Sequence, residues 1–555
     1  MKEQLIHAVK EACQELFGVE ITPELTRPEE KFGDYASNIA LQLANQVGKN
    51  PREIAETLAD KLQGREGIAK VEVAGPGFLN FTVTNQTLIK SLAQPLAKSL
   101  EGKVVVAEYS DPNPFKVLHA GHLYTSVVGD AIANLLETAG ATVHRVNFGG
   151  DVGLHVGKTM WAIIGELGGE NPEKLDKIPA EDRAQWMADA YVKGTNAFED
   201  DEGAKEQIIA YNKQVYALHQ EQDHDSPFAR IYWTCRDWSY DYFNAFYERI
   251  GTKFEKYYPE SEVADLGLKT VKEQLEKGVF QHSDGAIIFD GEKYGLHTRV
   301  FINSEGIPTY EAKDVGLIMT KWQDYHFDKS VVITGNEQEQ YMAVVLKAIE
   351  QFAPELTQAT SHLTHGIVKL TGGVKMSSRK GNILRAVDVI DAAKEANKAA
   401  TGNDDEQSAL AAVKYSFLKQ RMGGDIIYDP EESVSILGNS GPYLQYAHAR
   451  ARSILSKSGK EVPETLDSEL EPAERSLVRK ISEYSETVEQ ATLELMPHHI
   501  CTYLYELAQT FNRFYEGNRV IDDPREEQRL WMVQAYADTL QSGLQLLNIP
   551  APESM

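Results

Sequence analysis

Apolar residues follow a strand period and then a helical period between residues 104 and 148. The four consecutive apolar positions 104–107 are typical of a buried parallel strand. After a polar loop with two prolines, apolar residues recur every three or four positions from 123 to 135 and Gly140 follows, which indicates an amphipathic helix with a glycine stop. A second strand is predicted over 142–148. These elements form a β-α-β unit, and α/β sheets bind nucleotides at the carboxyl ends of such strands.

Residues 1–100 carry a different pattern, which predicts a small α+β domain. Helical periodicity and short strand-like runs both occur before the first strand of the β-α-β unit. The predicted helices cover 2–17, 36–47 and 51–63, and the strand-like runs cover 71–73 and 78–83.

The rest of the chain continues the α/β pattern and then becomes wholly helical. We assign 101–400 to an α/β domain with an aromatic-rich helical insertion around 153–250. Strand signals disappear from about residue 407 onward, so 401–555 is predicted to form an all-α helical bundle. The sheet of the α/β domain is predicted to resume at 286–289 and 331–333.

The composition is that of an ordinary globular protein, with 42% hydrophobic and 25% charged residues in a chain of 555. No apolar run approaches the length of a membrane span, and charges interrupt the first helix, which argues against a signal peptide. Three widely separated cysteines exclude a disulfide framework and a Cys-x-x-Cys zinc site. We therefore expect a cytoplasmic protein without bound zinc or membrane contact. The net charge of −27 argues against indiscriminate nucleic-acid binding but leaves room for a specific RNA partner.

Two histidines stand at the start of the helix that follows the 104–107 strand, in the order His119-Ala120-Gly121-His122. Imidazole N–H groups at a helix N-terminus suit phosphate oxygens, on which negative charge grows during nucleotidyl transfer. The tetrapeptide alone is a weak signal, because ordinary histidines also cap or flank helices. Its position at the carboxyl end of a strand favours phosphate binding.

A second candidate site is a basic, hydroxyl-rich segment that follows Gly372-Gly373. Lysine and arginine donors beside serine hydroxyls suit a mobile clamp on a triphosphate, although on composition alone a solvated charged turn is the commoner case. The histidine pair in the same chain favours the clamp. The residues concerned are Lys375, Met376, Ser377, Ser378, Arg379 and Lys380.

These two segments together resemble the HIGH and KMSKS signatures of class I aminoacyl-tRNA synthetases. The longer run from Glu108 to His122 resembles the arginyl-tRNA synthetase version of the first signature. The resemblance extends over almost the whole chain, through 33–38 and 75–81 near one end and 442–450 near the other. It implies a Rossmann-like parallel-sheet catalytic domain between an N-terminal tRNA-contacting domain and an anticodon-binding helical bundle.

The resemblance also implies an ATP-dependent arginine–tRNA ligase. Such an enzyme forms arginyl-adenylate and then transfers arginine to the 3′ end of tRNA(Arg). The implied partners are arginine, tRNA(Arg) and ATP with its Mg²⁺. The family generally activates arginine only when tRNA is present, and we expect a monomer.

For the arginine site, a planar guanidinium with five donors requires carboxylates that bind it in a fork. Such a pocket rejects uncharged amino acids by about 10⁴ or more, since its charges would stay unpaired. Taken singly, Asp314 could be a surface acid or a helix cap, and Tyr310 could be a core residue. The resemblance places Glu108 and Asp314 on the guanidinium, Asn113 on the backbone groups, Tyr310 against the substrate and Gln338 nearby.

For ATP, the resemblance places His119, Gly121 and His122 on the phosphates, with the second signature beside them. Arg379 stands where class I enzymes generally carry lysine. Lys116 is the family's usual substitute for that lysine, and Lys380 could also contribute. Leu123-Tyr124 and the run 151–157 also depart from the family's pattern, which leaves details of the surrounding pocket open.

Two pairs of residues in the flanking domains are candidates for tRNA binding. Phe78 and Asn80 match an aromatic-x-Asn pair that contacts the tRNA D-loop in some members, and aromatic stacking with an amide edge is a common way to read single-stranded bases. Tyr443 and Tyr446, with Arg450, match the anticodon-binding helical domain. For Phe78 and Asn80 the alternative explanation is a buried strand end. For Tyr443 and Tyr446 it is ordinary core packing.

Three other functions fit parts of the pattern. A class I synthetase for another amino acid is disfavoured, since there is no cysteine set for the cysteinyl type and Glu108 with Asp314 would repel acidic substrates. A non-catalytic tRNA-binding paralogue would not need both signatures intact. A small adenylyltransferase would not need the two flanking domains.

Overall fold

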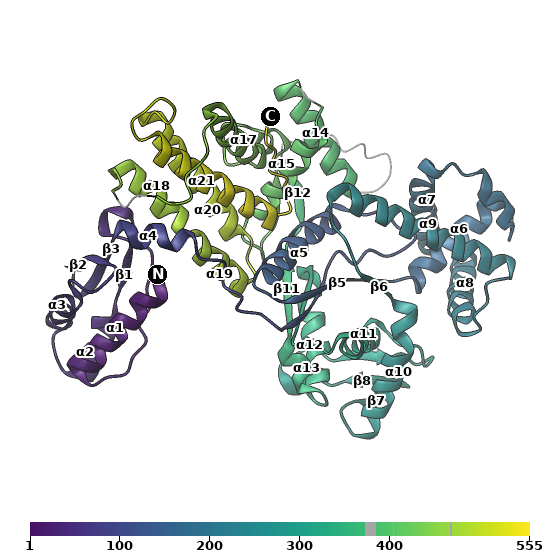
Figure 1. The fold of residues 1–555 in the computed structure, drawn as a ribbon. Coiled ribbons are helices and arrows are strands. Elements are labelled where there is room, and N and C mark those ends of the chain that lie inside the picture. The colour runs from purple at the N-terminus through teal and green to yellow at the C-terminus, as the bar shows by residue number, and fades with distance from the viewer. Residues whose placement is uncertain (372–383, 403, 467–468) are drawn as a thin grey trace.

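The computed structural model describes residues 1–371, 384–402, 404–466 and 469–555. The predicted triphosphate clamp at 375–380 therefore lies outside the described residues. Figure 1 shows an N-terminal domain, a central sheet covered by helices, a helical insertion on the side away from the N-terminal domain, and a C-terminal bundle above the sheet.

The N-terminal domain contains a three-stranded antiparallel sheet of order β1-β3-β2, covered by α2 and α3. The helices predicted over 2–17 and 51–63 are confirmed to within a residue. The helix predicted from residue 36 begins only at Ile39, because a short strand takes the preceding residues. The elements are α1 (Lys2–Phe17), β1 (Tyr35–Ser37), α2 (Ile39–Val47), α3 (Pro51–Leu62), β2 (Ile68–Ala74), β3 (Phe78–Val83) and α4 (Asn85–Leu92).

The central sheet has five parallel strands in the order β11-β10-β4-β5-β6. Two of its strands were not predicted from the sequence, β6 and β11. The chain builds β4, β5 and β6 outward in one direction and then crosses back to add β10 and β11 on the other side of β4. The strands are β4 (Val104–Glu108), β5 (Thr142–Gly149), β6 (Lys256–Pro259), β10 (Lys329–Gly335) and β11 (Thr360–His365).

Both faces of this sheet are buried, as the continuous apolar run predicts. Val105 and Ala107 of β4 belong to one core, which they share with α5, α14 and α15. Val106 points to the opposite core, which lies under α10, α11 and α12. These helices are α5 (Ala120–Thr138), α10 (Glu260–Glu276), α11 (Tyr310–Tyr325), α12 (Glu339–Glu350), α14 (Ala386–Thr401) and α15 (Glu406–Leu418), with the short α13 (Pro354–Ala359) after α12.

Two predictions about strands are wrong. The run 286–289 is a strand, but it belongs to a separate antiparallel sheet of order β7-β8-β9 and not to the central sheet. Strand structure also continues beyond residue 407, since β13 pairs with β12. At 286–289 a short apolar run specifies a strand without specifying its partner, whereas the three residues of β13 are too few to show a strand period. The strands are β7 (Gln281–Ser283), β8 (Ala286–Phe289), β9 (Arg299–Ile302), β12 (Val368–Leu370) and β13 (Ile426–Tyr428).

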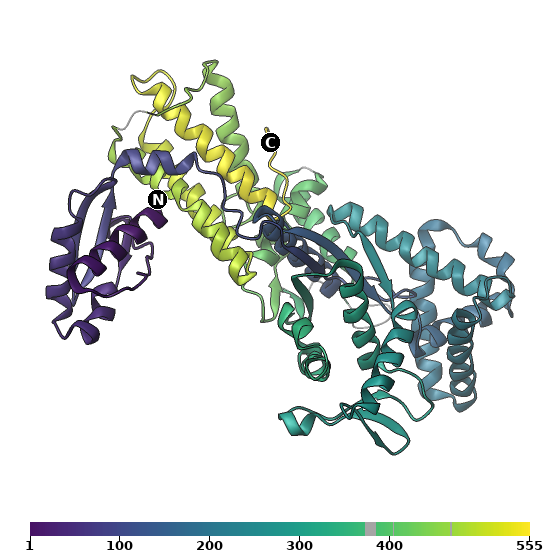
Figure 2. The same cartoon turned by 60° about the horizontal axis from the view of Figure 1, so that its bottom comes forward.

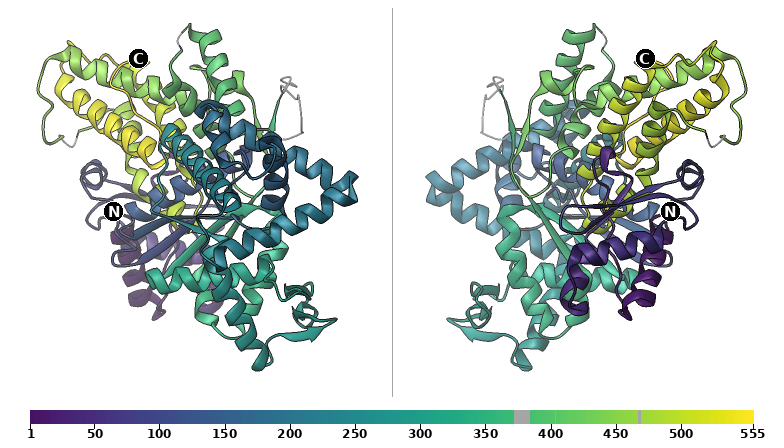
Figure 3. Two further views of the ribbon diagram at one scale, coloured as in Figure 1. Left: turned by 90° about the vertical axis from the view of Figure 1, so that its right-hand side faces the viewer. Right: turned by 90° about the vertical axis from the view of Figure 1, so that its left-hand side faces the viewer.

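The insertion after β5 is helical, as predicted. Figure 2 shows it projecting from the edge of the sheet, and the left view of Figure 3 shows its helices end-on and side-on together. Its core joins Phe115 of the loop after β4 to Tyr232 and Cys235. The helices are α6 (Leu154–Leu167), α7 (Arg183–Asp200), α8 (Glu202–Gln220) and α9 (Pro227–Ile250).

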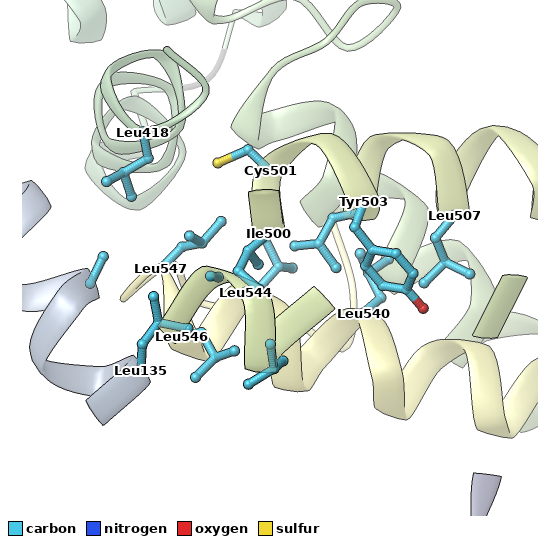
Figure 4. Close-up of a cluster of buried hydrophobic side chains, with 14 of the residues drawn as sticks. Leu135, Leu418, Ile500, Cys501, Tyr503, Leu507, Leu540, Leu544, Leu546 and Leu547 are labelled. Carbon is cyan, nitrogen blue, oxygen red and sulfur yellow. The ribbon is translucent and has the colours of Figure 1, made fainter. Parts of the chain in front are cut away.

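The C-terminal bundle shares one continuous core with the central sheet. Figure 4 shows Ile500 and Leu544 of the bundle packed near Leu135 of α5 and Leu418 of α15. Across the described residues, no helix has both the length and the apolar content needed to cross a membrane. The bundle helices are α16 (Pro430–Ser433), α17 (Gly441–Ser458), α18 (Pro472–Ser482), α19 (Tyr484–Glu494), α20 (His498–Gly517) and α21 (Glu526–Leu546).

Helices α10 and α11 approach unusually closely through two glycines. A Cβ on Gly267 would overlap the carbonyl oxygen of Ala312, and a Cβ on Gly316 would overlap that of Val263. Only hydrogen at these positions lets the two backbones meet. Because α11 carries Asp314, this contact sets where that carboxylate lies relative to the sheet.

We expect Gly316→Ala to separate α10 from α11, with an overpacking cost of about 1–3 kcal/mol. Thermal unfolding should show the lost stability. Calorimetry should show weaker binding of arginine, the ligand that the resemblance assigns to Asp314, because Asp314 moves with α11. Gly165→Ala in α6 is the matched control, since no atom lies within 4 Å of its added Cβ. Unchanged arginine binding in Gly316→Ala would mean that the helix contact does not position the site.

Candidate active site

One cavity of about 790 Å³ opens at the carboxyl ends of β4, β10 and β11, beside the N-terminus of α5. The strand order reverses between β4 and β10, and open α/β sheets bind ligands at such a switch point. Among the described residues, no group of three or more His, Cys, Asp or Glu is placed to hold a metal ion. The lining includes Glu108, Asp111, Asn113, His119, Gly121, His122, Glu260, Tyr310, Asp314, Gln338, Tyr341 and His365.

The loop between β4 and α5 follows an unusual backbone path. Ser110, Asp111 and Phe115 have φ of 76°, 49° and 67°. Non-glycine residues persist in this left-handed region only where the surrounding structure enforces it, and such residues cluster at functional sites. The loop therefore needs strong anchors.

The end of β5 supplies these anchors through two backbone N–H groups. Asp111 accepts from the N–H of Phe148 (2.8 Å), and Oδ1 of Asn113 accepts from that of Gly150 (2.7 Å). A Cβ on Gly150 would lie 2.8 Å from Oδ1 of Asn113 and 2.9 Å from Oε1 of Glu260, so the close approach requires glycine. The anchored Asn113 keeps its Nδ2 group for other partners.

His119 and His122 cap α5 reciprocally. Nδ1 of His119 accepts from the N–H groups of Gly121 (3.1 Å) and His122 (3.4 Å), and Nδ1 of His122 accepts from the N–H of His119 (3.0 Å). The two rings stack with their centroids 3.6 Å apart. Gly121 makes room for this arrangement, because a Cβ there would lie 2.8 Å from Cε1 of His119.

This capping fixes the tautomer of both rings. An Nδ1 that accepts a hydrogen bond carries no proton, so the proton of each neutral ring lies on Nε2. Burial lowers the pKa of His119, and burial together with the charge of His119 lowers the pKa of His122 well below its ordinary value. Both rings are therefore neutral near pH 7, and each has an Nε2–H to donate at the positive end of α5.

The chain that follows the predicted clamp returns to the same histidines. The N–H of Ala120 donates to the carbonyl of Leu384 (2.8 Å), and the N–H of Ala386 donates to that of Leu118 (2.9 Å). Leu384 also lines the cavity. Leu384, the first described residue after 372–383, is thus fixed beside the start of α5.

Glu108 is the last residue of β4, and its carboxylate is buried against Lys321 of α11. The ammonium of Lys321 also lies 3.4 Å from the Ser330 hydroxyl, so one protein lysine already offsets the charge of Glu108. No motif in the sequence marks Lys321 as part of the site. Burial and the neighbouring Glu108 raise the pKa of Asp111 well above its ordinary value, which favours its protonated form.

Asp314 lies in the same cavity but lacks a cation of its own. Its carboxylate accepts a hydrogen bond from the Tyr341 hydroxyl, and it forms no ion pair with any described residue. Burial raises its pKa to about 7, against the hydrogen bond from Tyr341 and with a further contribution from Glu108. A cationic ligand would stabilise the charged form of this group.

Three other predicted residues lie at or beyond the rim of the cavity. Tyr310, the first residue of α11, is 55% exposed and lines the opening, as does the exposed Gln338. Lys116 is not among the lining residues, and its ammonium lies 4.5 Å from the ring centroid of Tyr191 in the insertion. The positive charge of Lys116 still contributes to the lowered pKa of both capping histidines, His119 and His122.

The run 151–157, which follows β5, holds in place the elements around the cavity. Asp151 accepts from the N–H of Ser261 (3.0 Å) and from Nε of Arg236 (3.0 Å), and so ties α10 to α9. Nε2 of His155 donates to the carbonyl of Gly150 (2.8 Å), within the run 151–157 that departs from the pattern of the resembled family. Burial lowers the pKa of His155 to about 3, so this ring is a neutral donor.

The candidate RNA contacts lie on the two flanking domains. Phe78 is 40% exposed and Asn80 is half-buried, on one face of β3, while Leu79 and Phe81 fill the core from the other face. The alternative of a buried strand end is therefore wrong for Phe78.

The second set of RNA candidates lies along one side of α17. Tyr446 is 45% exposed, and Tyr443 accepts a hydrogen bond from Nδ2 of Asn512 (2.9 Å). The guanidinium of Arg450 lies 4.7 Å from the ring centroid of Tyr515. These residues form an aromatic surface between α17 and α20, of which only part is free for a ligand.

Three family models match nearly the whole chain. Residues 83–427, more than half of the chain, match the model described as tRNA synthetases class I (R), catalytic domain. The chain belongs to the arginyl-tRNA synthetase family. Residues 3–83 match the Arginyl tRNA synthetase N terminal domain, and 444–555 match the DALR anticodon binding domain. The resemblance found in the sequence is confirmed.

Relatives named for the same family extend over the full length. An arginine–tRNA ligase of Flavobacterium psychrophilum is 29% identical over 548 residues, covering 91% of this chain and 90% of its own. One from Porphyromonas gingivalis is 28% identical over 599 residues, covering 100% and 99%. The structure of Thermus thermophilus arginyl-tRNA synthetase superposes with a TM-score of 0.82 at 26% identity, covering 100% of both chains. The predicted class I synthetase fold is thus confirmed.

We expect Gly121→Ala to slow adenylate formation without weakening arginine binding. The added Cβ would lie 2.8 Å from Cε1 and 2.9 Å from Nδ1 of His119, so the ring must rotate and lose its capping hydrogen bonds. Loss of one aligned donor to a developing charge costs roughly 10²-fold or more in rate. ATP–pyrophosphate exchange at saturating tRNA measures the rate and calorimetry the affinity. An unchanged exchange rate would show that the reciprocal cap is not needed.

Arginine binding should weaken as the pH falls from 8 to 6. Asp314 has a pKa of about 7 in the free protein, and a bound guanidinium lowers it, so binding requires loss of a proton below pH 7. The Kd should rise about tenfold over this range, with proton release on binding near pH 6.5. Calorimetry in buffers of different ionisation enthalpy measures both. Asp314→Asn should bind more weakly with a flat pH profile, and a flat profile in the unmodified protein would contradict this assignment.

Proposed function

We propose that the cavity at β4, β10 and α5 makes arginyl-adenylate from arginine and ATP, and that the arginyl group then passes to tRNA(Arg). One observation carries this proposal: Asp314, a buried carboxylate that pairs with no described cation, shares a single cavity with two imidazole Nε2–H donors at a helix N-terminus. The first feature suits a guanidinium and the second a phosphate.

The chemistry needs no covalent nucleophile from the protein. In the first step, a carboxylate oxygen of arginine attacks the α-phosphorus of ATP, a P–O bond forms, and the bond to the departing pyrophosphate breaks. In the second step, a ribose hydroxyl at the tRNA 3′ end attacks the carbonyl carbon and loses its proton, and AMP departs. The work of the protein is positioning and stabilisation of charge.

In this scheme Asp314 and Glu108 hold the guanidinium from two sides. Lys321 occupies one oxygen of Glu108, so Asp314 is the stronger partner. Tyr310 lies against the substrate at the rim, and Nδ2 of Asn113 meets its backbone groups. Gln338 lies at the opening of the cavity, near the substrate.

His119 and His122 donate from Nε2 to the phosphates of ATP, which arrives as its Mg²⁺ complex. Gly121 keeps the two rings stacked and capped. Lys116 adds positive charge from the side of the insertion and substitutes for the lysine that Arg379 replaces, with Lys380 as the other candidate. The clamp itself comprises Lys375, Met376, Ser377, Ser378 and Arg379, which lie outside the described residues.

The flanking domains, 1–100 and 401–555, hold the tRNA while 101–400 carries the chemistry. Phe78 and Asn80 meet the D-loop, on the exposed face of β3. Tyr443, Tyr446 and Arg450 meet the anticodon region, along α17. We expect the protein to act as a monomer in the cytoplasm.

The test is ATP–pyrophosphate exchange with each of the twenty amino acids, with and without tRNA(Arg). Arginine alone should support exchange, and only when tRNA is present. Exchange driven by another amino acid would overturn the substrate, and no exchange under any condition would favour a non-catalytic tRNA-binding protein. Asp314→Ala should then lose arginine affinity far more than ATP affinity, while equal losses of both would point to a wrong pocket.

A further inference from the structure

The motif Gly33-Asp34-Tyr35 lies at the junction between the N-terminal domain and the C-terminal bundle. Asp34 is fully buried, and Oδ2 of its carboxylate accepts from the N–H of Val83 at the end of β3 (2.8 Å). Gly33 has φ of 105°, and a Cβ there would lie 2.7 Å from the carbonyl oxygen of Phe81. Glycine therefore lets the chain turn so that Asp34 reaches the end of β3.

Two arginines of α18 bind this carboxylate from the other domain. Arg475 donates to both oxygens of Asp34, at 2.7 and 3.3 Å, and Nε of Arg479 lies 3.3 Å from Oδ1. Arg475 also donates to the carbonyl of Val83 (3.2 Å), and Arg479 to that of Pro28 (2.8 Å). A fork of this kind fixes orientation as well as distance.

A second group of bonds joins the same two domains. Glu486 of α19 accepts from Arg27 at 2.7 and 3.3 Å and from the Tyr35 hydroxyl at 2.6 Å. The Arg27 guanidinium lies 4.0 Å from the centroid of the Tyr35 ring. We call these contacts the interdomain lock: the hydrogen bonds of Asp34 with Arg475, its ion pair with Arg479, and the hydrogen bonds of Glu486 with Arg27 and Tyr35.

One strand connects this lock to the candidate RNA surface of the N-terminal domain. β3 begins at Phe78 and ends at Val83, which the lock holds from both domains. Figure 1 shows β3, α4 and α18 side by side, and α4 packs on α18. The exposed Phe78 thus has a fixed position relative to the bundle that matches the anticodon binding domain.

We propose that Asp34 is a positioning residue for tRNA: through Arg475 and Arg479 it holds the Phe78 face of β3 at the distance from the bundle that one tRNA molecule spans. This rests on the proposed function, in which Phe78 and Asn80 meet the D-loop. Two modules on one rigid frame bind a two-point ligand with a high effective concentration, which is lost when their geometry is free to vary. Asp34 itself does not touch the RNA.

Asp34→Asn keeps the shape of the side chain but leaves two guanidinium groups facing an uncharged amide. We expect the KM for full-length tRNA(Arg) to rise roughly tenfold or more, because the N-terminal domain no longer contributes to binding. The KM values for arginine and ATP in tRNA-dependent exchange should stay unchanged, since the lock contacts neither substrate. A general folding defect would change all three.

The decisive comparison uses a tRNA(Arg) transcript that lacks the D-loop. The unmodified protein should bind it much more weakly than full-length tRNA, whereas Asp34→Asn should hardly distinguish the two. Arg475→Gln breaks the lock from the bundle side and should give the same loss of discrimination. This second variant keeps the test decisive if Asp34→Asn does not fold. Arg65→Gln is the control, because its ion pair with Glu11 lies within the N-terminal domain.

The outcomes separate the two levels of the proposal. If the unmodified protein discriminates against the D-loop deletion and both lock variants discriminate equally well, the lock does not position tRNA and the inference is overturned. If the unmodified protein does not discriminate, the N-terminal contact in the proposed function is wrong, and the inference fails with it. The double variant Asp34→Asn with Phe78→Ala should bind tRNA(Arg) no more weakly than either single variant. Fully additive losses of tRNA affinity would also contradict the inference.

Discussion

A buried carboxylate that pairs with no cation among the described residues is the constraint on which the central cavity depends. Glu108 and Glu260 each have a lysine of α11 within hydrogen-bond reach, whereas among the described residues Asp314 has only the hydroxyl of Tyr341. Burial therefore favours the protonated form of Asp314 until a cation arrives. A guanidinium is suited to this arrangement, since its planar fork can meet one carboxylate while it lies beside another.

The rest of the structure keeps that carboxylate and the histidine pair in one place. The close contact of α10 with α11 sets the position of Asp314, and the end of β5 holds the strained loop that leads from Glu108 to His119. The reciprocal cap then orients both imidazoles by fixing their protons on Nε2. The flanking domains are not loosely tethered, because the bundle shares a core with α5 and the interdomain lock fixes the N-terminal domain.

Local sequence predicts the parts of this site that depend on local structure. The strand at 104–107, the helix that follows and the histidines at its start lie within one short stretch, so periodicity and spacing suffice to find them. Partners across the fold leave no such trace: Lys321 and Tyr341 carry no motif, and only the packing of α11 and α12 brings them to the acids. The same reason explains the error at 286–289, where an apolar run shows a strand but not the sheet to which it belongs. The roles of the predicted site residues stay predictions.

The most direct test of the account compares arginine with citrulline, which has nearly the same shape but a neutral ureido group in place of the guanidinium. The measurement is kcat/KM for tRNA-dependent ATP–pyrophosphate exchange with each amino acid at pH 8, where Asp314 is charged. If the buried charge of Asp314 and Glu108 selects the substrate, arginine should be preferred by about 10⁴ or more. A preference of only a few fold would contradict the account, because shape and not charge would then decide what the cavity accepts.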